Sequence, residues 1–328
     1  MIETHASPWP GTPTRQRLIL HIGTHKTGTS AIQDALSRSR AALAAQGVLY
    51  ARTDREPFPN LPKHCSLWRA ANDVEGRLAE EERRILSEEL DACGAHTLVL
   101  SEEGLSEPLP RLARFFVPWM SRFDITVICM VRRQDLFLES LFSQFVREPG
   151  RRDSRVLSAF LQAAPVRDRL DYQRWLGHWQ DTLRCKLVTL DFDATVRSEE
   201  GLLGRFMAAA GLPPLPVQAA RVNATPDMRL ALVVNQLNRL KLDYDIEQLS
   251  QASAALLAEG RLQPLKRLLG RDARQRLLDA MVPSNLRLQQ QFGVRFDASM
   301  PDEPAGMTEL PDHAFMLEML ARLSTRTG

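Results

Sequence analysis

The chain has 328 residues, of which 44% are hydrophobic and 25% are charged, values that are ordinary for globular proteins. Its formal net charge of +2 gives no general reason to expect nucleic acid or a membrane surface as a partner. The length exceeds one average domain but fits a single α/β domain with a helical extension.

Short apolar runs and segments of helical periodicity alternate along the first two thirds of the chain. The expected strands are 18–22, 48–50, 97–100, 125–131 and 186–190. The expected helices around them are 29–45, 79–93, 109–120, 136–146, 156–164, 170–183 and 201–210. This alternation predicts a central parallel sheet with right-handed crossovers, in a three-layer α/β/α fold.

Three further segments complete the expected domain organisation. Residues 1–16 are predicted to form an irregular lead-in, and the proline-bearing stretch 51–74 a long loop. A second proline-bearing stretch ends the sheet domain, which we place at 17–225, and a helical region is expected over 226–328. The helices expected in that last region are 228–242, 246–258, 272–281, 284–292 and 309–323.

The cysteines and the N-terminus bear on the cellular compartment. The four cysteines are scattered and form no C-x-x-C pair, which favours free thiols over a disulfide framework. The first residues lack the apolar region of a signal peptide. No apolar stretch reaches the roughly 18 residues that a membrane span needs. We therefore expect a soluble, cytoplasmic protein without a membrane span.

Two glycines separate the first expected strand from the first expected helix. Gly23 and Gly28 have the spacing of a phosphate-binding loop, in which successive backbone N–H groups and a helix N-terminus converge on an anion. Nucleoside triphosphatases place a lysine directly after the second glycine. Here Thr29 occupies that position, Ser30 follows, and the lysine is Lys26 in the middle of the loop.

The string His25-Lys26-Thr27-Gly28-Thr29-Ser30, which follows Thr24, resembles the 5′-phosphosulfate loop of bacterial sulfotransferases. These enzymes use 3′-phosphoadenosine-5′-phosphosulfate (PAPS) as donor. The resemblance implies a P-loop-like sulfotransferase fold over residues 17–225 and a donor-binding loop formed by 24–30. It assigns Lys26 to the oxygen between sulfur and phosphorus, and it implies no metal. Thr29 and Ser30 would also suit plain capping of the helix.

The same family has a second donor-binding element at the end of its fourth strand. An arginine there, and a serine eight residues later, bind the 3′-phosphate of the donor. Arg132 and Ser140 reproduce this spacing. The family's usual Asn-Pro after the arginine is replaced by Arg133-Gln134, so Arg133 is a second candidate for the anchor.

Sulfuryl transfer also needs a general base to accept the proton of the acceptor. Families of this fold use a glutamate or a histidine after the second or third strand. Glu102 directly follows the third expected strand, and His64 lies in the long loop after the second. The sequence leaves both open.

The resulting hypothesis is a PAPS-dependent sulfotransferase that acts on a hydroxyl or amine of a carbohydrate, lipid or other natural product. A small molecule or glycan is thus the expected partner, and nucleic acid is not. The alternatives are a P-loop kinase or nucleotide hydrolase, and a non-catalytic nucleotide-binding relative. The helical region 226–328 is expected to cover the acceptor site or to form a homo-oligomer contact.

Overall fold

The structure, a computed structural model, describes residues 15–53, 61–73, 76–217, 227–260, 264–300, 306–311 and 313–324. The expected domain boundary at 225 lies outside these ranges.

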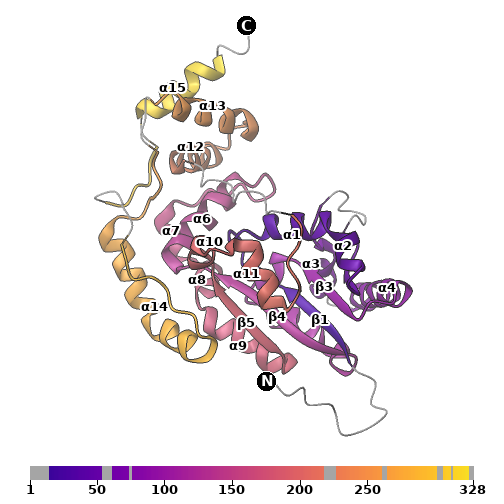
Figure 1. The fold of residues 1–328 in the computed structure, drawn as a ribbon. Coiled ribbons are helices and arrows are strands. Elements are labelled where there is room, and N and C mark those ends of the chain that lie inside the picture. Colours follow the sequence, from indigo (N-terminus) through magenta and orange to yellow (C-terminus); the bar gives the residue numbers. More distant parts are fainter. Residues whose placement is uncertain are drawn as a thin grey trace, which may run out of the picture.

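A five-stranded sheet forms the centre of the molecule, with strand order β2-β3-β1-β4-β5 and every pair parallel (Figure 1). Its strands are β1 (Gln16–His21), β2 (Val48–Tyr50), β3 (Thr97–Ser101), β4 (Phe123–Val131) and β5 (Lys186–Asp191). Because β1 is central, the loop that follows it lies between the ends of β3 and β4. The predicted parallel α/β fold is confirmed.

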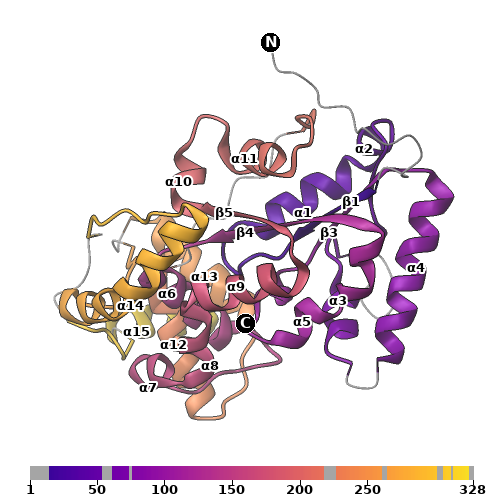
Figure 2. The same cartoon turned by 90° about the horizontal axis from the view of Figure 1, so that it is seen from below.

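Helices cover both faces of this sheet, as Figure 2 shows. Leu18 and Leu20 of β1 pack on one face and Ile19 on the other, as the alternation of side chains along a strand requires. The first face is covered by α3 (Cys65–Ala71), α4 (Arg77–Cys93), α5 (Pro110–Arg114), the 3₁₀ turn η2 (Val117–Ser121) and α9 (Tyr172–Leu183). The second is covered by α1 (Thr29–Arg38), α2 (Arg40–Ala44), α10 (Phe192–Arg197) and α11 (Gly201–Ala210). Both faces are therefore buried, which explains why the strands are nearly continuous apolar runs.

The remaining helices pack beside the sheet and around α6, which follows β4. They are α6 (Gln134–Arg147), α7 (Leu157–Gln162), α8 (Ala164–Leu170), α12 (Met228–Arg239), α13 (Ile246–Ala258), α14 (Arg271–Phe292) and α15 (His313–Ser324). α12 packs on α6, and α13 and α15 form a smaller core with α12. α14 lies along α6 and α9. In Figure 1, α12, α13 and α15 lie away from the sheet. None of the described helices is long and apolar enough to cross a membrane.

Several expected helix limits are wrong. The expected loop 51–74 contains α3, whose buried Leu67, Ala70 and Ala71 pack on the sheet. The prolines that precede α3 favoured a loop in the sequence, so its short helical period was not recognised. The expected helix 29–45 breaks at Ser39, whose backbone (φ −101°, ψ 12°) leaves the helical range.

Proline had opposite effects at two other expected limits. The expected helix 109–120 divides into α5 and η2, with Pro118 inside the 3₁₀ turn. Two helices were expected on either side of Pro283, but α14 runs through it. Buried Ser284 and Leu288 hold the second half of α14 against the rest of the protein. α10 was not expected at all.

Candidate functional site

The loop between β1 and α1 requires glycine at both ends. Gly23 has φ +99°, and a Cβ there would lie 3.0 Å from Cβ of Glu103. Gly28 has φ +74°, and a Cβ there would lie 2.5 Å from Leu202 on α11. Both positions are in the left-handed region that side chains disfavour. The two glycines thus let the loop pass close to its neighbours on either side.

Two threonines hold the loop from inside. The Thr24 N–H and hydroxyl both donate to the carbonyl of Met130 on β4, at 2.7 and 3.1 Å. The Thr27 hydroxyl donates to the Thr24 carbonyl at 2.6 Å. Both side chains are buried, so their hydroxyls shape the loop and do not face its mouth.

The start of α1 leaves backbone donors available. Gly28 occupies the N-cap position, and no described side chain caps the helix, Thr29 and Ser30 included. The first N–H groups of a helix have no partner within it. Together with the positive end of the helix dipole they form a place where an anion is stabilised.

Lys26 stands at the tip of this loop in a left-handed conformation with φ 62°. Its side chain is exposed, and no carboxylate in the described part of the chain pairs with it. The surrounding protein still removes part of the water around the ammonium, and together with the nearby guanidinium groups of Arg147 and Arg132 this lowers the pKa of Lys26. The loop therefore presents a cation in an already positive neighbourhood.

Arg132 and Ser140, the pair expected to bind the 3′-phosphate, are in contact with each other. Arg132 Nη1 donates to Ser140 Oγ at 3.1 Å. Its Nε and Nη2 donate to the two carboxylate oxygens of Asp193 on α10, each at 3.1 Å. Its guanidinium also lies 5.3 Å from the ring centroid of Phe192. Arg132 thus already holds an oxyanion in the two-pronged manner that guanidinium groups use for carboxylates and phosphates.

Arg133 has a different position and different partners. It is buried, and its Nε and Nη2 donate to the two oxygens of Asp135 at 2.8 and 2.9 Å. Its Nη1 donates to the carbonyls of Asp297 and Ser299, both at 2.6 Å. Arg133 therefore ties the segment after α14 to the start of α6.

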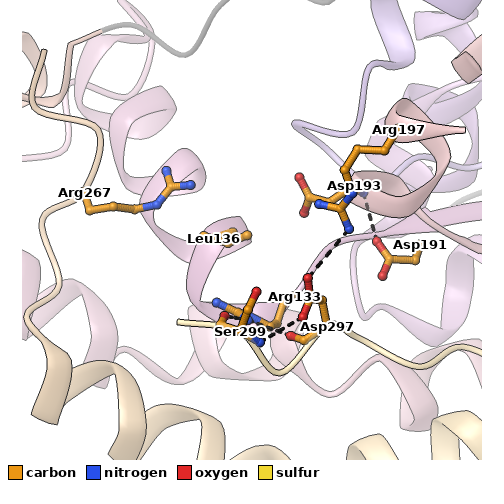
Figure 3. A pocket seen from close by; sticks show the side chains of 8 residues that line it. All are labelled: Arg133, Leu136, Asp191, Asp193, Arg197, Arg267, Asp297 and Ser299. Carbon is orange, nitrogen blue, oxygen red and sulfur yellow. Dashed lines mark hydrogen bonds and ion pairs between the residues drawn. The ribbon is translucent and has the colours of Figure 1, made fainter. Parts of the chain in front are cut away.

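A cavity of about 190 Å³ lies beside Arg133 and is lined in part by the segment after α14 (Figure 3). Arg267 extends into it from the side opposite Asp193 and Arg197. The lining residues are Arg133, Leu136, Asp191, Asp193, Arg197, Arg267, Asp297 and Ser299. The C-terminal region thus supplies three of the residues that line this cavity.

Two further arginines add positive charge near Lys26 and Arg132. Arg147, at the end of α6, donates to the carbonyl of Ser143 at 2.9 Å, and burial lowers its pKa. Arg267 lies 3.8 Å from a carboxylate oxygen of Glu139, and its pKa is lowered chiefly by burial. A cluster of partly desolvated cations from four separate segments favours a multiply charged anion.

Glu102 follows β3 at the opposite side of the loop. Its backbone N–H donates to the carbonyl of His21 at 3.0 Å, which fixes it beside the end of β1. Its Oε1 accepts from the Gly104 N–H at 2.9 Å, while its buried Oε2 has no hydrogen-bond partner among the described residues. Burial, together with the negative charge of Glu103, raises the pKa of Glu102 to about 7.

His25 and Glu103 lie in the same charged cluster. Lys63 Nζ donates to Glu103 Oε1 at 2.8 Å, and Gln33 Nε2 donates to Glu103 Oε2 at 2.9 Å. Burial lowers the pKa of His25 to about 4, against the opposing effect of Glu103. The imidazole of His25 is therefore neutral near pH 7.

His64 is buried at the ends of β2 and β3. Its Nδ1 accepts from the Ser101 N–H at 3.0 Å, and its Nε2 lies 3.1 Å from the carbonyl of Ala51. The ring also stands edge-on to Tyr50, with centroids 4.9 Å apart. Both ring nitrogens thus have backbone partners, whereas one oxygen of Glu102 has none in the described part of the protein. The two candidate bases differ in that respect, and their roles remain predictions.

The residues of this site that were not singled out from the sequence are Asp193, Arg147, Arg267, Gln33, Lys63 and Glu103. The 42 basic residues are nearly all arginine, so no spacing distinguishes Arg147 or Arg267. Gln33 lies one helical turn after Thr29 on the same buried face of α1, and this position is what could have indicated it from the sequence.

No protein-family model matches the sequence, and the comparison with curated proteins also finds no match. Among solved structures, a sulfotransferase from Alicyclobacillus acidocaldarius aligns over 87% of this chain and 98% of its own, with 11% identity and a TM-score of 0.44. The sulfotransferase domain from the curacin biosynthetic pathway aligns over 75% of this chain and 99% of its own, with 14% identity and a TM-score of 0.34. Likenesses at this level assign no function to the chain.

Proposed function

We propose that the protein is a PAPS-dependent sulfotransferase that acts on a hydroxyl or amine of a small-molecule or glycan acceptor. The observation that carries the proposal is Lys26, which no carboxylate of the described residues pairs with, in a glycine-bounded loop next to the Arg132–Ser140 contact at the end of strand β4. Two anion sites at the same edge of a sheet suit a donor that has phosphate at two positions.

The residues present fit such a donor. Arg132 holds the Asp193 carboxylate with two donors while Nη1 contacts Ser140, so this group of side chains already stabilises an oxyanion. Arg132 and Ser140, with Arg267 nearby, would hold the 3′-phosphate. The backbone N–H groups at the start of α1 would hold the 5′-phosphate.

When bound, PAPS supplies a sulfuryl group attached to a phosphate leaving group. Catalysis of such transfers rests mainly on positioning and on electrostatic stabilisation. Lys26 keeps a positive charge where negative charge develops on the leaving oxygen. Glu102 has a buried carboxylate oxygen without a hydrogen-bond partner among the described residues, which could accept the proton of the acceptor, and its pKa of about 7 suits a base that works near neutral pH.

Thermal unfolding with nucleotides tests the proposal. We expect adenosine 3′,5′-bisphosphate to raise the melting temperature in EDTA, and ADP or AMP to raise it much less. Ligand at about a hundred times its dissociation constant adds about 2.7 kcal/mol. Each kcal/mol raises the midpoint by about 2–4 °C in proteins of about 150–250 residues.

Two other outcomes would identify the alternatives. A larger rise with ADP and magnesium than with the bisphosphate would indicate a P-loop kinase or nucleotide hydrolase. Bisphosphate binding without transfer of labelled sulfate from PAPS to a panel of sugar, phenol and amine acceptors would indicate a non-catalytic relative.

A further inference from the structure

Two adjacent glutamates at the end of β3 have unequal surroundings. We propose that Glu103 is a positioning residue: held as a fixed anion by Lys63 and Gln33, it keeps the neighbouring Glu102 able to accept a proton. The functional meaning of this inference rests on the proposed sulfotransferase activity, but the electrostatic relation between the two side chains can be measured without it.

Both carboxylate oxygens of Glu103 are occupied. Lys63 Nζ donates to Oε1 at 2.8 Å and Gln33 Nε2 donates to Oε2 at 2.9 Å. Gln33 is buried, with 1% of its surface exposed, and its amide also donates to Ser101 Oγ at 3.2 Å. Glu103 is therefore held by one donor from α1 and one from the segment before α3, and Ser101 of β3 holds the Gln33 amide in place.

Glu102 has fewer and weaker partners than Glu103. Its Oε1 has the Gly104 N–H, and Lys63 Nζ is 3.7 Å away, nearly one ångström further than from Glu103. Its Oε2 is buried and has no hydrogen-bond partner in the described part of the protein. A buried carboxylate oxygen without a donor binds a proton more readily than one with two donors.

The pair lies directly against the loop that carries Lys26. The Glu102 N–H donates to the His21 carbonyl at 3.0 Å, two residues before Gly23. Cα of Glu103 would lie 3.1 Å from a Cβ at Gly23. A proton acceptor at this point is next to the anion-binding loop, where an acceptor group must approach the donor.

The charges around the pair agree with this division of roles. Lys63, His25 and the hydrogen bonds from Lys63 and Gln33 outweigh burial and lower the pKa of Glu103 to about 2. Burial and the charge of Glu103 outweigh Lys63 and raise the pKa of Glu102 to about 7. Divergent pKa values in neighbouring carboxyls are typical of acid–base sites. Cys65 also acts on Glu102, whose pKa it lowers through a side-chain hydrogen bond, and the negative charges of the pair act in turn on Tyr50 and His21.

Carboxyl ¹³C NMR of protein labelled at glutamate side chains tests the proposal directly. The Glu102 resonance is assigned by its loss in Glu102→Gln. In Glu103→Gln we expect the Glu102 titration midpoint to move to lower pH by about one pH unit or more, because the negative charge is gone and Lys63 acts on Glu102 alone. In Lys63→Met we expect it to move to higher pH.

Three variants separate charge from disturbed packing. Glu103→Asp and Lys63→Arg retain the charges and should keep the midpoint near its original value even if they loosen the structure. Glu107→Gln removes a glutamate four residues after Glu103. Glu107 is paired with Arg169 at 2.9 Å, so this change should leave the titration midpoint of Glu102 unchanged. Midpoints that move in the same direction in Glu103→Gln and Lys63→Met, or that do not move, would overturn the proposal.

The pH dependence of sulfate transfer supplies the second arm. The acidic limb of kcat/KM should follow the NMR midpoint, downward in Glu103→Gln and upward in Lys63→Met. If the acidic limb of the kcat/KM profile stays at the same pH while the NMR midpoint moves, the role of Glu103 in catalysis is overturned. Opposite NMR shifts in a protein that transfers no sulfate would support the relation between the two glutamates and contradict the proposed function.

Discussion

Lys26 presents a cation that no carboxylate neutralises in the described part of the chain. Replacing it with alanine should reduce turnover by about 10²–10³-fold, the usual effect of losing one preorganised group at developing charge. The melting temperature should not fall, because Lys26 is exposed and lies near the positive charges of Arg132 and Arg147. Sulfate transfer from labelled PAPS and thermal unfolding measure the two effects.

Lys186→Ala is the matched control, since Lys186 is exposed at the start of β5. Near-normal turnover in a folded Lys26→Ala protein would rule out the role of this lysine at the leaving group.

The neighbours Arg132 and Arg133 should give different phenotypes. Hydrogen bonds to charged groups contribute about 1.5–3 kcal/mol each, so Arg132→Ala should remove most of the preference for adenosine 3′,5′-bisphosphate over AMP. Arg133→Ala breaks a buried ion pair with Asp135, which typically destabilises by about 3–5 kcal/mol. Titration calorimetry measures the first effect, and unfolding of the ligand-free protein measures the second.

Arg205→Ala on α11 serves as the control, because Arg205 is exposed. If Arg133→Ala loses nucleotide preference at unchanged stability, the anchor is one residue later than we propose.

Glu102 makes stability depend on pH. Its pKa rises from 4.5 in the unfolded chain to about 7 in the folded protein. Between these values the folded protein binds a proton that the unfolded chain has released, so this group's contribution to stability falls as pH rises. Glu102→Gln should therefore gain melting temperature relative to wild type between pH 5 and pH 8.

Glu88→Gln on the exposed surface of α4 gives the baseline for that comparison. A difference in melting temperature that stays constant over this range would mean that Glu102 is not a buried anion at pH 8.

Helices α6 and α14 are joined through a buried arginine. Arg274 is fully buried and contacts Asp135, Glu139 and the Leu269 carbonyl. Arg274→Met should lower stability by about 3–5 kcal/mol, because two carboxylates of α6 lose a buried partner. Arg276→Met, on the exposed side of α14, should have little effect in the same urea titration. Equal losses in the two variants would mean that the α6–α14 contact contributes little.

Element by element, what could be predicted depended on how local the determining interactions are. Strand β2 and helices α11 and α13 begin and end where their apolar periods and flanking glycine or aspartate indicate. α14 could not be predicted, because its continuity across Pro283 depends on packing against α6 and α9. Local sequence reports the proline but not the surface that holds the helix on both sides of it.

For the molecule as a whole, Arg132 and Ser140 were singled out only through the resemblance of their segment to sulfotransferases. The loop after β1 was predictable from the sequence itself, because its glycine spacing lies within one strand–turn–helix unit. The C-terminal wall of the cavity, formed by Arg267, Asp297 and Ser299, was not predictable. It depends on Arg133 meeting Asp297, 164 residues away, and on Gln134 meeting Asn285, 151 residues away. Both contacts join segments that are far apart in the sequence, so their consequence appears only in three dimensions.

The position of that wall in the sequence also determines when the parts of the cavity form during synthesis of the chain. A nascent chain that has emerged only through β5 already contains Lys26, Glu102, Arg132 and Ser140, and it can pair all five strands. It still lacks Asp297 and Ser299, so Arg133 has no carbonyls to bind and one side of the cavity is open to water. On the ribosome the anion-binding loop is therefore synthesised first, and the cavity can be enclosed only after Asp297 and Ser299 have been synthesised.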